Sequence, residues 1–192
     1  MYASGRGRGV ISLIFTQTDL EGAYIVDIEA RQDERGYFAR VWCSREFAAQ
    51  GLKTDLVQCN VAYNHKKGIL RGMHYQGQPH AEVKLVRCTR GAVYDVIVDL
   101  RVDSPSYLKW VGVELTEENH RMLYVPEGFA HGYVTLQDNS ELFYQVSQFY
   151  TPSAEGGVRW DDPAIGIEWP DIGELTISAK DREWPLMQEP SS

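Results

Sequence analysis

Cysteine, long apolar runs and positive charge are all scarce in this sequence. Of its 192 residues only 3 are cysteine, and Cys43, Cys59 and Cys88 lie far apart without a C-x-x-C pair. This spacing indicates neither a disulfide framework nor a zinc ribbon, and it favours a reducing, cytoplasmic environment. No stretch reaches the ~18 consecutive apolar residues of a membrane-spanning helix, so we expect a soluble protein.

The N-terminus also lacks the pattern of a secretory signal. Arg6 and Arg8 precede an apolar stretch at 10–15, but Ser12 interrupts it and it is shorter than the apolar region of a signal peptide. We therefore expect no export. Residues 1–9 have no periodic apolar face, and we expect them to be flexible or to form an interface arm.

Acidic residues outnumber basic ones. The 19 Lys and Arg and the 27 Asp and Glu give 19 − 27 = −8, which makes nucleic acid or an anionic membrane a poor general partner. Hydrophobic residues at 43% and aromatic residues at 11% are ordinary globular proportions and exclude a disordered or collagen-like chain. We expect one domain over 1–192, in which any anionic ligand is bound by local cations.

Short runs rich in β-branched residues dominate the chain, and turn residues separate them. Residues 93–100 are the clearest case, because their side chains alternate with the period of a strand. No strand alternates with a long amphipathic helix, so the pattern predicts an all-β antiparallel sandwich or jelly roll with a few short helices. The expected strands are 23–28, 37–42, 56–63, 84–88, 93–100, 107–115, 121–125, 131–136 and 141–150.

Only two stretches look helical. Ser44 is a candidate N-cap for a helix at 45–50 that Gly51 ends, and Thr116 is a candidate cap for one turn through Asn119. Residues 157–192 are expected to form an irregular C-terminal wrap.

Reactive side chains cluster in two segments. The first is RGMHYQ at 71–76, followed by Lys84, and the second is PEGFAHG at 126–132. The second resembles half of the cupin signature, in which a turn delivers His131 into the barrel. Metal-binding cupins add an H-x-H element, but this chain has His74-Tyr75-Gln76. Two histidines are too few ligands for a metal, so we expect none.

Several segments, in this order, resemble the dTDP-4-dehydrorhamnose 3,5-epimerase family of cupin-type nucleotide-sugar epimerases. The resemblance covers about residues 19–181, and a series of motifs in order is more specific than any one motif. The matching segments are DERGYF at 33–38, QCN at 58–60, GILRGMHYQ at 68–76, KLVRCTRGAVYDVIVDLR at 84–101, SPSYLKW at 104–110, YVPEGFAHGY at 124–133, ELFYQVSQFY at 141–150, RWDDPAIGIEWP at 159–170 and SAKD at 178–181.

The resemblance implies an isomerase that works without a metal or other cofactor. It implies a homodimer that exchanges N-terminal strands and a nucleotide-linked 4-keto-6-deoxy sugar as substrate. The reaction it implies converts dTDP-4-dehydro-6-deoxy-D-glucose to dTDP-4-dehydro-L-rhamnose. We therefore expect a cytoplasmic enzyme of carbohydrate biosynthesis.

Position by position, the resemblance also implies roles for single residues. His74 matches the general base, Asp181 the carboxylate that orients it, and Tyr144 the acid on the opposite face. Lys84 matches the cation beside the keto oxygen. The implied substrate-binding residues are Arg35 and Arg71, which hold the diphosphate, together with Gln58, Asn60, His131, Tyr150 and Lys180.

These roles form a coherent mechanism, because a carbon-bound proton next to a ketone is removable only when the enolate oxygen is stabilised. Alternatives stay open: an epimerase that inverts only C3 or C5, a ketoisomerase, a metal-dependent cupin, and a non-catalytic sugar-binding cupin. One departure from the family pattern is Glu82-Val83 before Lys84. Since side chains two apart in a strand share a face, Glu82 is expected on the side of Lys84.

Overall fold

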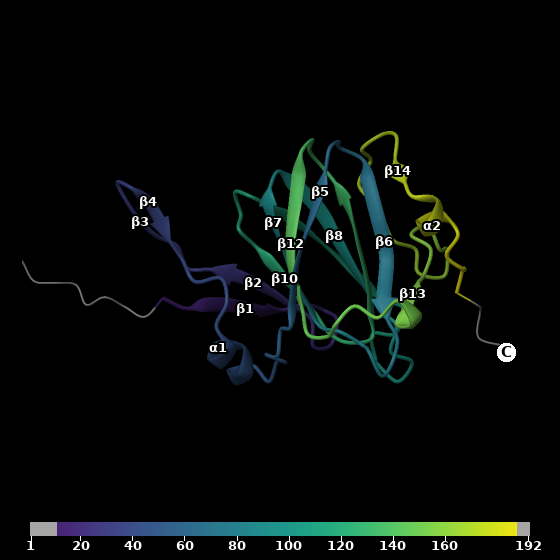
Figure 1. Cartoon of the computed structure of the whole chain (residues 1–192), viewed down its shortest axis with the longest axis horizontal. Helices are drawn as coiled ribbons and strands as arrows, with labels where there is room; N and C mark the ends of the chain where they lie inside the picture. The colour runs from purple at the N-terminus through teal and green to yellow at the C-terminus, as the bar shows by residue number, and fades with distance from the viewer. Residues whose placement is uncertain (1–10, 188–192) are drawn as a thin grey trace, which may run out of the picture.

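The computed structural model describes residues 11–187. Two packed antiparallel sheets form the body of the molecule, and short helices lie at its periphery (Figure 1). The expectation for residues 1–9, and that for the last residues of the C-terminal wrap, fall outside the described residues.

Sheet one has six strands, and every neighbouring pair in it is antiparallel. In spatial order they are β1 (Leu13–Gln17), β2 (Tyr24–Ile28), β10 (Met122–Val125), β7 (Lys84–Arg90), β12 (Ser140–Val146) and β5 (Gln58–Asn64).

Sheet two faces sheet one across the core. Its strands, in spatial order, are β13 (Glu155–Gly157), β6 (Ile69–Gln76), β11 (Phe129–Thr135), β8 (Ala92–Asp99) and β9 (Trp110–Thr116), with β14 (Thr176–Ile177) added parallel to β6. The predicted all-β sandwich is therefore confirmed. Strands β1, β6, β13 and β14 of the two sheets were not expected, whereas the expected segments at 107–115 and 141–150 overlap the shorter β9 and β12, each of which extends one residue beyond its segment.

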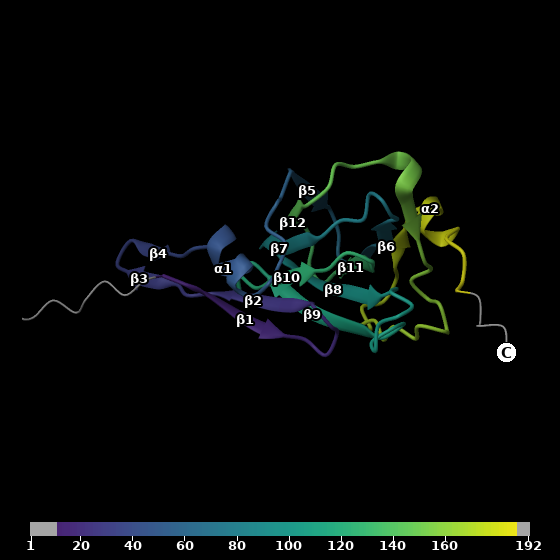
Figure 2. The same cartoon turned by 90° about the horizontal axis from the view of Figure 1, so that it is seen from below.

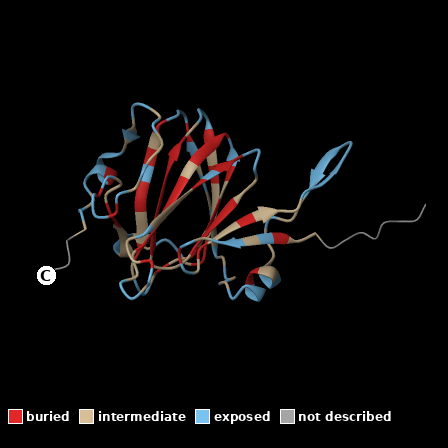
Figure 3. Cartoon of the chain, turned by 180° about the vertical axis from the view of Figure 1, so that it is seen from behind, coloured by how far each residue is buried: buried red, intermediate tan, exposed pale blue. Residues whose placement is uncertain are grey.

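The core fills the space between the sheets. Ile97 of β8, Leu123 of β10 and Leu142 of β12 are almost fully buried in one cluster. Burying one such side chain stabilises the fold by roughly 1.5–3 kcal/mol. Strand β8 is buried on both faces, because Val96 and Val98 pack on its other side against Val158 and residues after it. Apolar residues between Val158 and Met187 thus pack on the outer face of sheet two. Figure 3 shows the buried residues, in red, gathered on the strands of the sandwich.

A two-stranded hairpin projects from the sandwich. Strands β3 (Arg31–Asp33) and β4 (Gly36–Phe38) are exposed along their whole length, and both views place them at the opposite end of the molecule from α2 (Ala179–Arg182) (Figures 1 and 2). The strand expected at 37–42 is correct only for its first two residues, because β4 ends at Phe38.

The helices differ from expectation at their caps. Helix α1 (Ser44–Ala49) begins one residue early, its N-cap is Cys43 and no side chain caps it, so the assignment of Ser44 as the cap is wrong. Burial of Phe47 anchors this helix instead. Gly51 follows with φ +74°, as its predicted role in ending the helix requires.

Thr116 does cap a turn, but not a helix. Its Oγ1 accepts hydrogen bonds from the backbone amides of Glu118 and Asn119, at 3.2 and 2.9 Å, and the residues form a hydrogen-bonded turn. A 3-10 helix (Pro152–Ala154) and helix α2 were not expected. Within residues 11–187 no helix combines the length and apolar character needed to cross a bilayer.

Candidate active site

The reactive side chains meet in a hollow between the two sheets. One cavity of about 360 Å³ contains His74, Lys84 and Tyr144 in its wall, and a second cavity of about 200 Å³ shares the same three residues. The first is completed by Gln58, Asn60, Tyr75, Gln76, Glu82, Val146, Tyr150 and Glu155, and the second by Ala62, Arg71, His131, Tyr133 and Leu142. The two cavities therefore form one hollow.

Strand register brings the residues of sheet one together. Val146 of β12 pairs with Lys84 of β7 on one side and with Gln58 of β5 on the other. Two residues earlier on β12, Tyr144 pairs with Asn60 of β5. Side chains two positions apart share a face of the sheet. The alternation of β5, β7 and β12 therefore turns these polar groups toward the same interior.

Sheet two supplies the histidines. His74 of β6 lies directly opposite His131 of β11 in the register. Two glycines allow the strands to approach at this point, because a Cβ on Gly72 would lie 2.6 Å from the Cα of Gly132, and Gly72 has φ +135°. The glycine in the RGMH segment therefore serves the close packing beside the histidines.

His74 is bonded to a carboxylate from the C-terminal region. Its Nε2 lies 2.6 Å from Oδ1 of Asp181, and the two side chains are 32% and 6% exposed. Ser178 holds Asp181 in place by accepting a hydrogen bond from the Asp181 amide at the start of α2. A neutral imidazole must donate from Nε2 to this carboxylate, which leaves Nδ1 free to accept a proton.

Burial is the main cause that lowers the pKa of His74, and the positive charge of Lys84 acts in the same direction. The hydrogen bond and the charge of Asp181 oppose this by raising the pKa. Because the net direction is downward, the imidazole is predominantly neutral at neutral pH. A neutral imidazole next to a buried carboxylate has the properties of a general base.

Lys84 is not a solitary cation. Its Nζ lies 2.6 Å from Oε1 of Glu82, and the two side chains are only 12% and 10% exposed. The expected placement of Glu82 on the side of Lys84 is therefore confirmed. An amide hydrogen bond from Gln76 reaches the other oxygen of Glu82 at 3.3 Å.

Tyr144 faces the histidines from sheet one. Burial raises the pKa of its hydroxyl, the negative charge of Glu82 raises it further, and Arg71 acts in the opposite direction. The phenol therefore stays protonated near neutral pH and is able to donate a proton. The hollow thus holds a base on one sheet, with an acid and an ammonium on the other.

The predicted binding residues divide into two groups. Arg71 lies in the hollow and donates to Asn64 at 3.0 Å, and Tyr150 is placed by its amide, which donates to Gln58 at 2.7 Å. Lys180 pairs with Glu155 beside His74, in the wall of a further cavity of about 450 Å³ that Asp181 also lines.

The second group, the predicted binding residues that lie away from the hollow of their own chain, consists of Arg35. It lies on the exposed hairpin, its side chain is 83% exposed, and it pairs with Asp33. The exposed aromatic residues Tyr37 and Phe38 lie on the same hairpin.

Sequence reasoning missed three residues of the site. Asp95 is fully buried and lies 2.9 Å from Nε2 of His131. Glu155 accepts hydrogen bonds from Tyr150 and Lys180, and the ring of Trp184 meets that of His74 edge to face at 6.1 Å. Asp95 alone carried a signal, because a charge inside a run of buried valines requires a partner.

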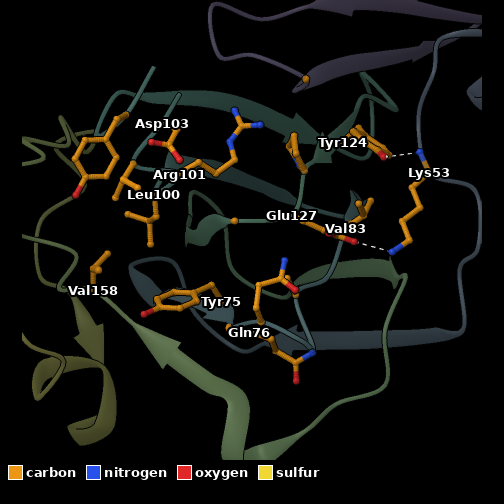
Figure 4. A pocket seen from close by; sticks show the side chains of 18 of the residues that line it. Lys53, Tyr75, Gln76, Val83, Leu100, Arg101, Asp103, Tyr124, Glu127 and Val158 are labelled. Carbon is orange, nitrogen blue, oxygen red and sulfur yellow. Dashed lines mark hydrogen bonds and ion pairs between the residues drawn. The ribbon is translucent and has the colours of Figure 1, made fainter. Parts of the chain in front are cut away.

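A larger cavity lies elsewhere in the described part of the chain. It measures about 1090 Å³, and the ion pair of Lys53 and Glu127 lies in its wall (Figure 4). It shares Tyr75 and Gln76 with the hollow but contains none of His74, Lys84 and Tyr144. Within residues 11–187 no three His, Cys, Asp or Glu side chains are grouped so as to suit a metal ion.

Comparisons with known proteins point to one family. The sequence model of the dTDP-4-dehydrorhamnose 3,5-epimerase family matches residues 17–189. A dTDP-4-dehydrorhamnose 3,5-epimerase from Methanothermobacter thermautotrophicus is 44% identical over 179 residues, which is 92% of this chain and 96% of that protein.

Two solved structures are also similar. The dTDP-4-dehydrorhamnose 3,5-epimerase of Bacillus anthracis, with TDP and PPi bound, has a TM-score of 0.88 and 38% identity over 92% of this chain and 100% of its own. The dTDP-6-deoxy-D-glucose-3,5-epimerase of Legionella pneumophila, in complex with dTDP-4-keto-L-rhamnose, has a TM-score of 0.86 and 34% identity over 91% of this chain and 93% of its own.

Proposed function

The chain belongs to the dTDP-4-dehydrorhamnose 3,5-epimerase family, and we propose that it inverts C3 and C5 of dTDP-4-dehydro-6-deoxy-D-glucose to give dTDP-4-dehydro-L-rhamnose. One observation carries the proposal. His74, oriented by Asp181, faces the same hollow as Lys84 and Tyr144. The proposed reaction uses these side chains alone, without a metal or other cofactor.

The chemistry follows from the placement of these groups. Neutral His74 takes the proton from the carbon next to the C4 ketone, and the electron pair of the broken C–H bond forms the C=C bond of an enolate. Lys84 stabilises the enolate oxygen, and one such donor contributes ~3–4 kcal/mol. Tyr144 then protonates the carbon from the opposite face, so that its configuration inverts. The proton on His74 returns to the tyrosinate through solvent, and the cycle repeats at the second carbon.

The diphosphate needs cations at the mouth of the hollow. Arg71 and Lys180 of the same chain lie near His74 and are suited to this role. The resemblance also assigns this role to Arg35, which lies on the projecting hairpin.

A homodimer reconciles these positions. We propose that the hairpin of one copy extends to the hollow of its partner and brings Arg35 to the diphosphate. Apolar side chains on the exposed hairpin and on sheet one support such an interface, since Phe38 and Val61 are 69% and 60% exposed. Light scattering of the purified protein should give the mass of two chains, and a monomer with full activity would contradict the proposal.

The nucleotide-linked substrate and the free thiols of Cys43, Cys59 and Cys88 support a cytoplasmic location. We propose no membrane and no nucleic acid as partners, because the net charge of −8 disfavours binding to either polyanion.

NMR of dTDP-4-dehydro-6-deoxy-D-glucose, incubated with the protein in heavy water, tests the proposed reaction directly. Deuterium should appear at both C3 and C5, and the product should have the L-rhamno configuration. Deuterium at only one carbon would identify a single-carbon epimerase. Binding of the nucleotide sugar without any exchange would identify a non-catalytic binding protein and overturn the proposal.

A further inference from the structure

Glu82 is a buried acid in the hollow for which the mechanism above has no role. It forms its ion pair with Lys84 at 2.6 Å, and both side chains are almost withdrawn from solvent. A buried carboxylate is costly unless it is paired and hydrogen-bonded, so its retention beside the reacting centre calls for a physical explanation.

The two oxygens of Glu82 have separate partners. Oε1 contacts the ammonium of Lys84, and Oε2 accepts a hydrogen bond from Nε2 of Gln76. The amide of Gln76 is itself anchored to the main chain: Nε2 also donates to the carbonyl of His80 at 3.1 Å, and Oε1 accepts from the amide of Thr151 at 2.6 Å. The carboxylate of Glu82 therefore lies between the fixed amide of Gln76 and the end of the flexible Lys84 side chain.

The backbone around Glu82 fixes its direction. The intervening Val83 is buried in a different cluster, and it is held by two hydrogen bonds with Ser147. Because Val83 packs away from the hollow, Glu82 and Lys84 both face it. A lysine side chain has four rotatable carbon bonds, and a single fixed carboxylate 2.6 Å away restricts where its ammonium lies.

We propose that Glu82 is the positioning residue of Lys84, holding the ammonium at the place where the enolate oxygen forms. This inference rests on the proposed function. The pairing occupies one N–H of Lys84 and leaves two for the keto oxygen. It also provides a counter-charge that offsets part of the cost of burying the ammonium.

Removing the negative charge of Glu82 changes the pKa of the neighbouring acid in a definite direction. Without Glu82, Tyr144 would lose a charge that raises its pKa, so its hydroxyl would lose its proton at a lower pH. The alkaline loss of activity should therefore begin at a lower pH. The other titratable or charged groups that line the same hollow are His74, Tyr75, Glu155, Tyr150, Arg71, His131 and Tyr133.

The variant Glu82→Gln tests the proposal, because it keeps the shape of the side chain and its contact with Gln76. We expect kcat to fall by about tenfold or more, with less than a roughly threefold change in KM, and the alkaline limb of the pH profile to move down by about one unit. The variant Glu82→Asp should recover part of kcat and return the alkaline limb to that of the wild type.

A matched control is available in the same chain. Glu127 pairs with Lys53 at the same 2.6 Å, but these side chains are 36% and 44% exposed and lie outside the hollow. The variant Glu127→Gln should leave kcat, KM and the pH profile unchanged.

Two results would overturn the proposal: a wild-type kcat in Glu82→Gln, or a reduced kcat with an unmoved alkaline limb, which marks a purely structural role. If Glu82→Gln does not fold, Glu82→Asp decides, since a wild-type kcat in that variant contradicts positioning. A failure of the proposed function can be told apart from a failure of this proposal, because the wild-type protein would then show no exchange at carbon.

Discussion

Two histidine–aspartate pairs lie side by side in this molecule, and their environments differ. His74 and His131 face each other across β6 and β11. The first pairs with Asp181 at 2.6 Å and the second with Asp95 at 2.9 Å. The imidazole of His74 is 32% exposed and that of His131 is 10% exposed. Both imidazoles line the hollow, so their exposure, and not the identity of the pair, distinguishes the proposed base His74 from the more deeply buried His131.

The two carboxylates also come from different parts of the fold. Asp95 lies on β8, the neighbour of β11 in the same sheet, so the sheet itself forms the pair with His131. Asp181 is 107 residues distant from His74 in the chain and lies on a four-residue helix. The pair with His74 therefore depends on docking of the C-terminal segment, whereas the pair with His131 forms with the core.

The strongest test of this difference is His74→Asn. Loss of the base should reduce exchange at both carbons by up to about 10⁴-fold, because general-base catalysis typically contributes 10²–10⁴-fold. Nucleotide binding should remain, since Asn preserves the size and polarity of the position. Deuterium uptake measured by NMR, with dTDP affinity as the control for folding, decides the outcome. Exchange at the wild-type rate in this variant would remove His74 as the base.

The converse variant is Asp95→Asn, which we expect to act on stability. Asp95 is fully buried, and losing its charge-assisted hydrogen bond with His131 costs about 1.5–3 kcal/mol. Thermal and urea unfolding should show this loss, while the folded fraction keeps measurable exchange at carbon. A variant that is as stable as the wild type but inactive would mean that the pair with His131 also belongs to the catalytic machinery.

These two pairs also show how far sequence can reach. His74, Lys84 and Tyr144 lie in recognisable motifs, and strand alternation is enough to turn each one toward the interior. The fold class follows from the same period-two pattern, because burial of one face of each strand requires a second sheet. These features depend on local pattern, which a single sequence displays.

Other features depend on what lies nearby in space, and these were harder to predict. The sequence places Glu82 on the face of Lys84, but the ion pair and its Gln76 anchor appear only in the folded chain. A charge among the valines around Asp95 requires a partner, but only the folded chain identifies that partner as His131. Helix α2 is four residues long and is held by the cap at Ser178 and by tertiary contacts, so its own sequence signal is weak.

The variant Asp181→Asn tests how Asp181 affects the orientation and the basicity of the His74 imidazole. Because Asp181 orients the imidazole and stabilises the imidazolium, we expect kcat to fall by roughly 10²-fold. Asp181 also raises the pKa of His74, so its removal lowers that pKa further. The acid limb of the rate profile, where His74 becomes protonated as the pH falls, should therefore move to lower pH. An unmoved acid limb would contradict the pairing as the cause.

Replacing Trp184 should have the smallest effect on the rate, and it should shift the pKa of His74 in the direction opposite to Asp181→Asn. Its ring shields His74 edge-on at a centroid distance of 6.1 Å, and burial is the main cause that lowers the pKa of His74. Removing the ring in Trp184→Ala admits water, so the pKa should rise and the acid limb should move to higher pH, opposite to its movement in Asp181→Asn.

The rate of Trp184→Ala at neutral pH should fall only about two- to threefold, since the base and its carboxylate remain. Trp184→Phe is the matched control, because it keeps an aromatic ring against His74 and should hold the acid limb near its wild-type position. If the limbs of Trp184→Ala and Asp181→Asn moved the same way, solvent access and the carboxylate would not act on His74 as opposing causes. The contrast with the buried pair of His131 would then need another explanation than exposure.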